Sequence, residues 1–388
     1  MVEQLWSGVI IWLGLAFLAS LISWRLGISV ALVELVVGIT AGNSFHLEIT
    51  PWVNFLASLG ALVLTFLAGA ELESAVIKKF WKASLALGVV SFAAPFALAW
   101  MLAQFVFGWG LRAAQIAGLA MSTTSVAVVY AVMVETGLNE TPLGKLILAA
   151  CFVTDLGTVI ALGLLFTNFG ATFWIFVAAT AVAMATLPRI TPFLLRKLNA
   201  HSSEPEVRYL LLVLAGLALL AVRGGSEGVL PAYLVGMVLA DAFLGNRELI
   251  KRMRATTFAL LTPFYFLKAG SLVSLRAVLA SLGLVAAFFA AKTGAKFLGL
   301  VPVGRVLGFT RRVNLYSTMM MSTGLTFGTI AALYGLNNGV ITKEQYSVLV
   351  VVVILTAIVP TLVAQSFFAP HAQETENPFG RKRGARHV

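Results

Sequence analysis

Charged residues are scarce in this chain of 388 amino acids: they make up 11% of it, against roughly 25% in an ordinary soluble domain. Hydrophobic residues make up 60%. A water-soluble fold of this size needs far more polar surface to cover its core. The composition therefore excludes a soluble enzyme, a disordered scaffold and a secreted disulfide-rich domain.

Residues suited to metal, redox and nucleotide chemistry are also few. The single cysteine, Cys151, lies in an apolar run and cannot form an intrachain disulfide. The four histidines fall in loops or in the tail, so no buried zinc or haem site is expected. The sequence has no phosphate-binding loop, which excludes transport driven directly by ATP. We expect no cofactor and no enzymatic activity.

Long apolar runs dominate the sequence instead. A helix crosses a bilayer with about 20 mostly apolar residues, and the chain offers thirteen such runs. They predict an all-α polytopic membrane protein with thirteen transmembrane helices in contact with the lipid bilayer. The expected spans are 5–24, 27–44, 52–72, 84–107, 113–134, 143–166, 172–195, 207–223, 228–244, 255–273, 277–302, 313–335 and 344–366.

The basic residues predict the orientation in the membrane. Of 27 lysines and arginines, 20 fall on one side of the spans and 4 on the other, and Lys268, Lys292 and Lys296 lie inside spans. Positive charge concentrates on the cytosolic side, so we expect an external N-terminus and a cytosolic C-terminus. The net charge of +11 thus reflects membrane topology, and no nucleic-acid partner is expected.

A weak internal repeat runs through the chain at a fixed offset. Phe66–Leu72 resembles Phe266–Leu272, and Met121–Thr123 recurs as Met321–Thr323, both 200 residues apart. Seven expected spans separate each segment from its copy, so the copy crosses the membrane in the opposite direction. This pattern predicts an inverted-topology repeat of spans 1–6 and 8–13, with span 7 as linker.

The repeated Met-Ser-Thr segments place hydroxyl groups and glycines in the middle of two spans, where they weaken a helix. Unwound backbone inside a membrane is tolerated only where it is buried in protein or lines a cavity. We therefore expect two broken helices that cross near the midplane and line a substrate site; the alternative is that these hydroxyls only join packed helices. The expected lining residues are Ser122, Thr123, Ser322, Thr323 and Thr326.

Ionisable groups inside spans are costly and need a reason. Asp155, at the middle of span 6, is the most deeply placed acid, and its carboxylate could hold either a proton or a metal cation. Lys292 and Lys296 are four residues apart and share one face of span 11, and from the residues alone either could reach Asp155. Glu34, inside span 2, could line a cytosolic funnel or cap a neighbouring helix.

Several local segments resemble the monovalent cation:proton antiporter family of NapA and the Kef exchangers, and more remotely NhaA. The resemblance covers nearly the whole chain, and it favours Lys296 as the family's core lysine. The segments are Val33–Gly38, Phe66–Leu72, Thr124–Val126, Pro263–Phe266 and Ala295–Gly299.

This resemblance implies a homodimer with a core domain that moves against a dimer domain. The membrane unit would occupy residues 1–372, with spans 4–6 and 11–13 (about 84–166 and 277–366) as core and spans 1–3 and 8–10 as dimer scaffold. A basic cytosolic tail, 373–388, is expected to be disordered.

The chain departs from the NapA-like pattern at the ion site. Those relatives have Asp-Asp where this chain has Thr154-Asp155, so one carboxylate remains. They also have a Pro-Arg-Gly-Glu segment in span 12, whose Arg and Glu become Gly324 and Thr326 here. Kef exchangers likewise have a neutral residue before the aspartate, which makes K⁺ a candidate beside Na⁺.

These observations predict a secondary Na⁺/H⁺ or K⁺/H⁺ antiporter of a prokaryotic inner membrane, with a role in pH homeostasis. Asp155 would bind the cation and the proton in turn, with Thr154, Thr124 and Ser125 as further oxygen ligands and Lys296 as electrostatic support. The alternatives are a sodium-coupled organic-anion symporter on a related fold and a membrane sensor built on a transporter fold.

Overall fold

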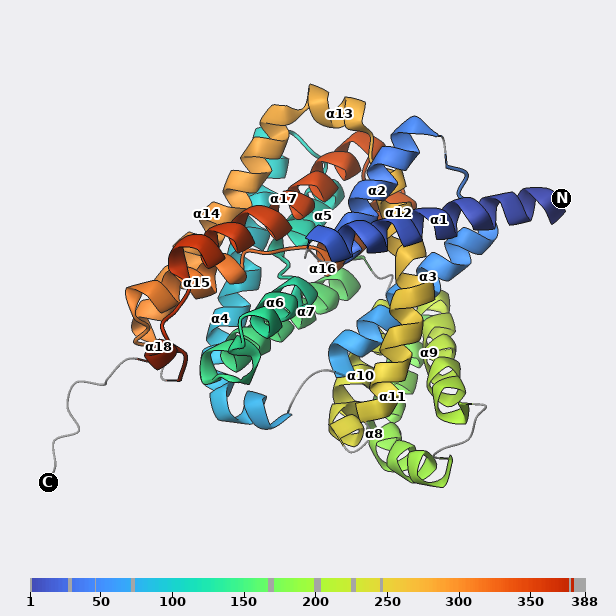
Figure 1. Ribbon diagram of the computed structural model, residues 1–388, viewed down its shortest axis with the longest axis horizontal. Coiled ribbons are helices and arrows are strands. Elements are labelled where there is room, and N and C mark those ends of the chain that lie inside the picture. The colour runs from blue at the N-terminus through green and yellow to red at the C-terminus, as the bar shows by residue number, and fades with distance from the viewer. Residues whose placement is uncertain are drawn as a thin grey trace, which may run out of the picture. The chain divides into compact units, whose positions relative to one another are not determined.

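The computed structural model describes residues 2–26, 30–45, 47–70, 74–166, 171–198, 204–224, 228–244, 247–376 and 378–379. All regular secondary structure in these residues is helical (Figure 1), as predicted. Eight helical stretches are long and apolar enough to cross a membrane. The helices that contain them are α1 (Val2–Leu26), α3 (Pro51–Ala70), α4 (Ser74–Met101) continued by η1 (Leu102–Val106), α7 (Pro142–Phe166), α8 (Ala171–Leu198), α9 (Pro205–Arg223), α14 (Leu282–Val306) and α17 (Lys343–Phe368).

The other five expected spans overlap shorter helices, so the count of thirteen stays a prediction. Two overlap α2 (Val30–Ser44) and α10 (Val229–Leu244), and the other three consist of two helical pieces each. These pairs are α5 (Leu111–Ser122) with α6 (Val126–Glu135), η3 (Thr257–Leu261) with α12 (Thr262–Ser271), and α15 (Arg311–Met320) with α16 (Thr326–Asn337). The remaining short helices are η2 (Leu138–Glu140), α11 (Arg247–Thr256), α13 (Leu275–Ala280) and α18 (Ala372–Glu376).

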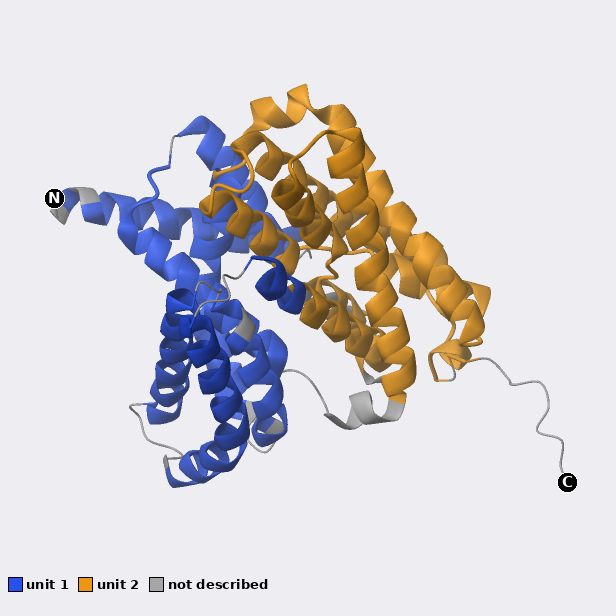
Figure 2. Cartoon of the chain, turned by 180° about the vertical axis from the view of Figure 1, so that it is seen from behind, with its two compact units in different colours: residues 1–74, 159–271 blue, residues 75–158, 272–388 orange. Residues whose placement is uncertain are grey.

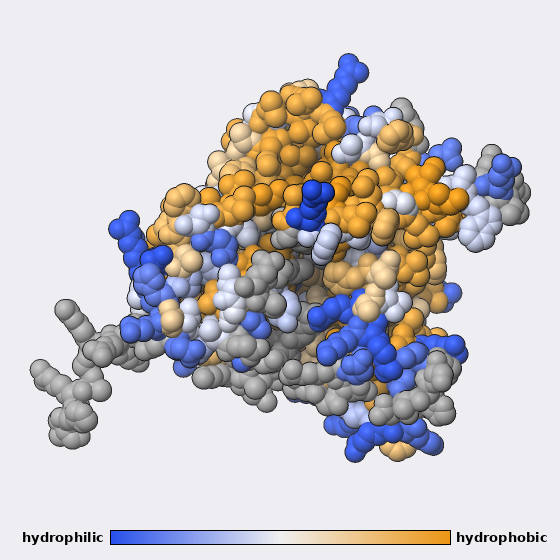
Figure 3. All heavy atoms as spheres, in the orientation of Figure 1, coloured by the Kyte–Doolittle hydropathy of each residue, from blue (hydrophilic) through white to orange (hydrophobic). Residues whose placement is uncertain are grey.

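Large apolar side chains lie on the outside of the long helices. Trp24, Phe105 and Val306 are 85%, 76% and 87% exposed, and apolar side chains cover much of the face shown in Figure 3. A soluble protein seldom exposes apolar patches of this kind, whereas lipid chains cover them without cost. The exposed surface thus agrees with an integral membrane protein.

The chain divides into two compact units (Figure 2). Unit 1 contains residues 1–74 and 159–271, and unit 2 contains residues 75–158 and 272–388.

Glycine residues allow two pairs of helices in unit 1 to pack closely. These pairs are α2 with α12 and α3 with α10. A Cβ on Gly38 would clash with the backbone of Leu267, and one on Gly236 with that of Phe66. Small residues let these backbones approach closely.

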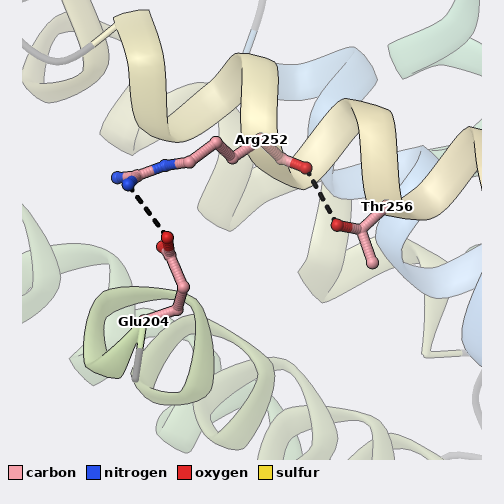
Figure 4. A network of polar contacts seen from close by, with 3 residues as sticks. All are labelled: Glu204, Arg252 and Thr256. Atoms are coloured by element: carbon pink, nitrogen blue, oxygen red, sulfur yellow. Dashed lines mark hydrogen bonds and ion pairs between the residues drawn. The ribbon is translucent and has the colours of Figure 1, made fainter. Parts of the chain in front are cut away.

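Helix α11 lies along the core of unit 1. Its Leu249, Ile250 and Met253 are buried in the main apolar cluster of that unit. On its polar side, Arg252 Nη1 lies 2.9 Å from Glu204 Oε1, and Thr256 Oγ1 donates to the Arg252 carbonyl at 3.1 Å (Figure 4). Both charged side chains are more than one-third exposed, so this ion pair orients α11 and adds little stability.

The start of the C-terminal tail is helical, whereas the sequence led us to expect disorder from residue 373 onward. Residues Ala372–Glu376 form α18, which is bonded to the start of α15. Thr310 Oγ1 donates to Glu374 Oε1 at 2.6 Å, and Arg312 Nε donates to the Ala369 carbonyl at 2.7 Å. Polar groups at the N-terminus of α15 therefore order the first part of the tail. Residues 380–388 lie outside the described residues.

Candidate functional site

Unit 2 contains two helices that are interrupted where the repeated Met-Ser-Thr segments occur. Helix α5 ends at Ser122 and α6 begins at Val126, while α15 ends at Met320 and α16 begins at Thr326. The segments between them are not helical. We call these two segments, 123–125 and 321–325, the helix junction.

The two interruptions are bonded to each other. The Ser125 N–H donates to the Thr323 carbonyl at 3.1 Å, and Thr124 Oγ1 donates to the Met321 carbonyl at 2.9 Å. Each interruption removes intrahelical partners from buried backbone groups, which must bond elsewhere. The junction supplies some of those partners, so its two segments hold one another in place.

Lys296 of α14 extends into this junction and is fully buried. Its Nζ donates to Ser91 Oγ at 2.6 Å, to Thr124 Oγ1 at 3.0 Å and to the Ser122 carbonyl at 3.2 Å. The sequence suggested Asp155 as its partner, but no ion pair joins them among the described residues. Three uncharged oxygen atoms, from α4 and from the first interrupted helix, satisfy the ammonium instead.

Asp155 lies in α7 and is 1% exposed. Its Oδ1 has no hydrogen-bond partner within the described part of the chain. The preceding Thr154 donates through Oγ1 to the Gly88 carbonyl at 3.3 Å and to the Ala150 carbonyl at 3.0 Å, which leaves its lone pairs free. A buried carboxylate oxygen without a partner is costly, so a proton or a cation is the natural complement of this group.

The other predicted hydroxyl residues are buried in the same unit, and most of them bond to their own helices. Thr323 Oγ1 donates to the Met320 carbonyl at 2.8 Å, and the Ser125 hydroxyl accepts from the Val128 N–H at 3.4 Å. Ser122 Oγ also lies 3.4 Å from Thr158 Oγ1, one turn after Thr154 on α7. The hydroxyl residues that unit 2 buries include Ser91, Ser122, Thr123, Thr124, Ser125, Thr154, Thr158, Ser322, Thr323, Thr326 and Thr329.

Lys292, one turn before Lys296 on α14, is also fully buried. Its Nζ has no hydrogen-bond partner in the described part of the protein. The ammonium lies directly over the backbone of Gly324, where a Cβ would clash with it. The two lysines therefore differ sharply in their surroundings, although they lie on the same helix face.

Comparison with known proteins agrees with this architecture. The transmembrane sodium/hydrogen exchanger family matches residues 13–369. The chain belongs to this family. The exchanger chain is 26% identical over 336 residues to a probable Na⁺/H⁺ antiporter 3 of Methanocaldococcus jannaschii, a match that covers 83% of the chain and 85% of that protein. It is 24% identical over 364 residues to the Na⁺/H⁺-K⁺ antiporter GerN of Bacillus cereus, covering 91% and 93%.

A solved structure shows the same fold. The sodium proton antiporter MjNhaP1 of Methanocaldococcus jannaschii matches with a TM-score of 0.69 at 16% identity, covering 94% of the exchanger chain and 97% of that chain. The all-helical transporter architecture is thus shared, whereas the ligands of the site have to be argued from this chain's own residues.

Two residues of the candidate site were not predicted. Ser91 and Gly88 lie on α4; Ser91 accepts from Lys296, and Gly88 accepts from Thr154 through its carbonyl. A lone serine and a lone glycine in an apolar run give no distinctive signal, although their spacing puts both near one face of a helix. Their role appears only once α4 is packed against α7 and α14.

Glu34 is not among the residues that unit 2 brings together. It lies in α2 of unit 1, is fully buried, and neither carboxylate oxygen has a partner among the described residues. Its proposed place in a cytosolic funnel stays a prediction.

Proposed function

We propose that the protein is a secondary antiporter that exchanges Na⁺ or K⁺ for H⁺ by alternating access. The single observation that supports this most is the buried carboxylate of Asp155, which has an oxygen without a partner among the described residues and belongs to the unit that contains both interrupted helices. Membership of the sodium/hydrogen exchanger family supports the same activity. The Na⁺/H⁺-K⁺ name of one relative keeps both cations as candidates.

In this mechanism Asp155 binds the cation and the proton in turn. Carbonyls of the helix junction and the hydroxyls of Thr154, Thr124 and Ser125 supply further oxygen ligands, as a hard monovalent cation requires. Lys296 stabilises the junction through Ser91, Ser122 and Thr124, and so keeps the interrupted helices in place while the carboxylate is empty. Because both ions compete for one carboxylate, the two fluxes are coupled without another energy source.

The presence of one carboxylate, that of Asp155, also suggests how many protons are exchanged for each cation. Thr154 replaces the first acid of the NapA-like pair, so one titratable acid serves both ions. We propose an electroneutral exchange of one cation for one proton.

The domain assignment is part of the same proposal. Spans 4–6 and 11–13 form the moving core, and the division of the chain into residues 75–158 with 272–388 and residues 1–74 with 159–271 supports this. The remaining elements of the proposal are thirteen spans in an inverted repeat, a homodimer in a prokaryotic inner membrane, and a cytosolic C-terminus.

Substitution of Asp155 by Asn tests the function. Asparagine preserves the size of the side chain and one carbonyl oxygen, so packing survives, but it removes the charge and the exchangeable proton. We expect the purified variant to keep its oligomeric state and to show no cation-dependent proton flux in proteoliposomes at any pH. Coupled exchange by a well-folded Asp155→Asn protein would refute Asp155 as the shared carrier.

A further inference from the structure

Lys292 presents a chemical problem that cation exchange does not solve. Its Nζ is fully buried and has no hydrogen-bond partner among the described residues. A charged ammonium in this position needs a negative or strongly polar partner. A neutral amine would also be left with unsatisfied N–H groups. In either protonation state, the complement of Lys292 is absent from the described protein atoms.

The surroundings of Lys292 are positive. Lys296 lies one helical turn away on α14. The ammonium of Lys292 lies over Gly324, two residues before α16 begins at Thr326. The N-terminus of a helix bears partial positive charge, and its first N–H groups have no intrahelical partners. The residue preceding α16 is Leu325, whose side chain cannot cap these groups.

The residues that the structure describes supply no counter-charge at this position. Asp155 is the only buried acid among the described residues of unit 2, and no ion pair joins it to Lys292. Lys292 Nζ does not fit a cation site, because a positive ammonium repels a cation and, among the described residues, no oxygen accepts a hydrogen bond from it. An ammonium beside an uncapped helix N-terminus is instead the combination that binds anions.

We propose that Lys292, Gly324 and the N-terminus of α16 form a binding site for a small monovalent anion such as chloride. Gly324 belongs to the site because any side chain there would displace the Lys292 ammonium from the helix N-terminus. The bound anion neutralises the excess positive charge of the two buried lysines over the single carboxylate. The site does not include Asp155, and its existence does not depend on the identity of the transported cation.

Thermal unfolding of the purified full-length protein tests the proposal. Chloride is titrated against gluconate at constant ionic strength and constant Na⁺. A ligand that binds only the folded state raises the free energy of unfolding, and at concentrations above Kd this increase grows with the logarithm of the ligand concentration. We expect the wild-type midpoint to rise with chloride, and the midpoints of Lys292→Met and Gly324→Ala to stay flat. Lys268→Met is the matched control, because it removes a buried lysine of unit 1, and it should keep the wild-type slope.

Direct binding keeps the proposal testable if a variant does not fold. Radiolabelled chloride should bind the wild-type protein saturably and be displaced by unlabelled chloride. A wild-type protein with neither saturable binding nor a chloride-dependent midpoint would overturn the proposal and leave water as the partner of Lys292. A Lys292→Met protein with the wild-type slope would overturn it as well. Neither outcome bears on Asp155, so failure here is distinct from failure of the proposed transport.

Discussion

The same substitution should affect stability differently at the two buried lysines of α14. Methionine is nearly as long as lysine and apolar, so Lys→Met keeps most of the packing and removes the ammonium. At position 296 this deletes three hydrogen bonds, to Ser91, Thr124 and the Ser122 carbonyl. At position 292 it deletes none that the described residues form.

The expected size of each effect follows from what is left behind. Without Lys296, Thr124 still donates to the Met321 carbonyl, and Ser91 lies 3.4 Å from Thr124, so the Ser122 carbonyl is the group that loses its donor. One unsatisfied buried polar group costs about 1–3 kcal/mol. Lys292→Met in chloride-free buffer removes an unpaired buried group, so its effect on stability is near zero or favourable.

Unfolding of the purified variants in detergent, followed by tryptophan fluorescence, measures the difference. We expect Lys296→Met to lower the unfolding midpoint and Lys292→Met to leave it unchanged or raise it. Lys296→Ala should likewise lower the unfolding midpoint more than Lys292→Ala, although each alanine variant also leaves a cavity that costs about 2–5 kcal/mol of stability. A larger loss for Lys292 than for Lys296 in both series would refute the assignment of Lys296 as the lysine that stabilises the junction.

Three further outcomes follow from the structure. The exchange rate in proteoliposomes should not change with an imposed membrane potential, and a reversal point that moves with potential would contradict one-for-one exchange. Gly88→Ala should reduce exchange and stability, because its Cβ would clash with Val153 of α7, whereas Gly294→Ala on α14 has open space and serves as the control. Partial burial raises the pKa of Glu374, but hydrogen bonds from Thr310 and the His371 N–H, with the charge of Arg312 nearby, outweigh burial and lower it below the ordinary value. Its ionised form therefore stabilises α18 above the unfolded-state pKa, and this stabilisation is lost as pH falls through the folded-state pKa. Hydrogen exchange of α18, corrected for intrinsic rates, should rise over that range, and Glu374→Gln should remove the dependence.

The sequence contained enough to predict the helical class and the position of the interrupted helices. Hydroxyl and glycine residues in an apolar run weaken a helix wherever it packs, so Ser122–Ser125 and Ser322–Thr326 marked the interruptions directly. Eight single helices are long enough to cross a membrane, because the other five expected spans fall on the short helices α2 and α10 or on pairs of shorter helical pieces.

The partners of the buried charges could not be predicted from the sequence. The spacing of Lys292 and Lys296 shows only that they share a helix face, and their different surroundings depend on which neighbours α14 meets. Ser91 lies 205 residues from Lys296, and no local pattern links them. The order of Ala372–Glu376 was missed for a similar reason, because it depends on Thr310 and Arg312 at a distant turn.

Competition between the cation and the proton for Asp155 is the central claim, and one measurement tests it most directly. The half-maximal Na⁺ or K⁺ concentration for wild-type exchange in proteoliposomes is determined across a series of pH values. If both ions bind one carboxylate, this concentration should rise as pH falls, approaching about tenfold per pH unit once the proton occupies most sites. A half-maximal concentration that stays constant across the series would contradict the shared site, even if Asp155 proved essential for transport.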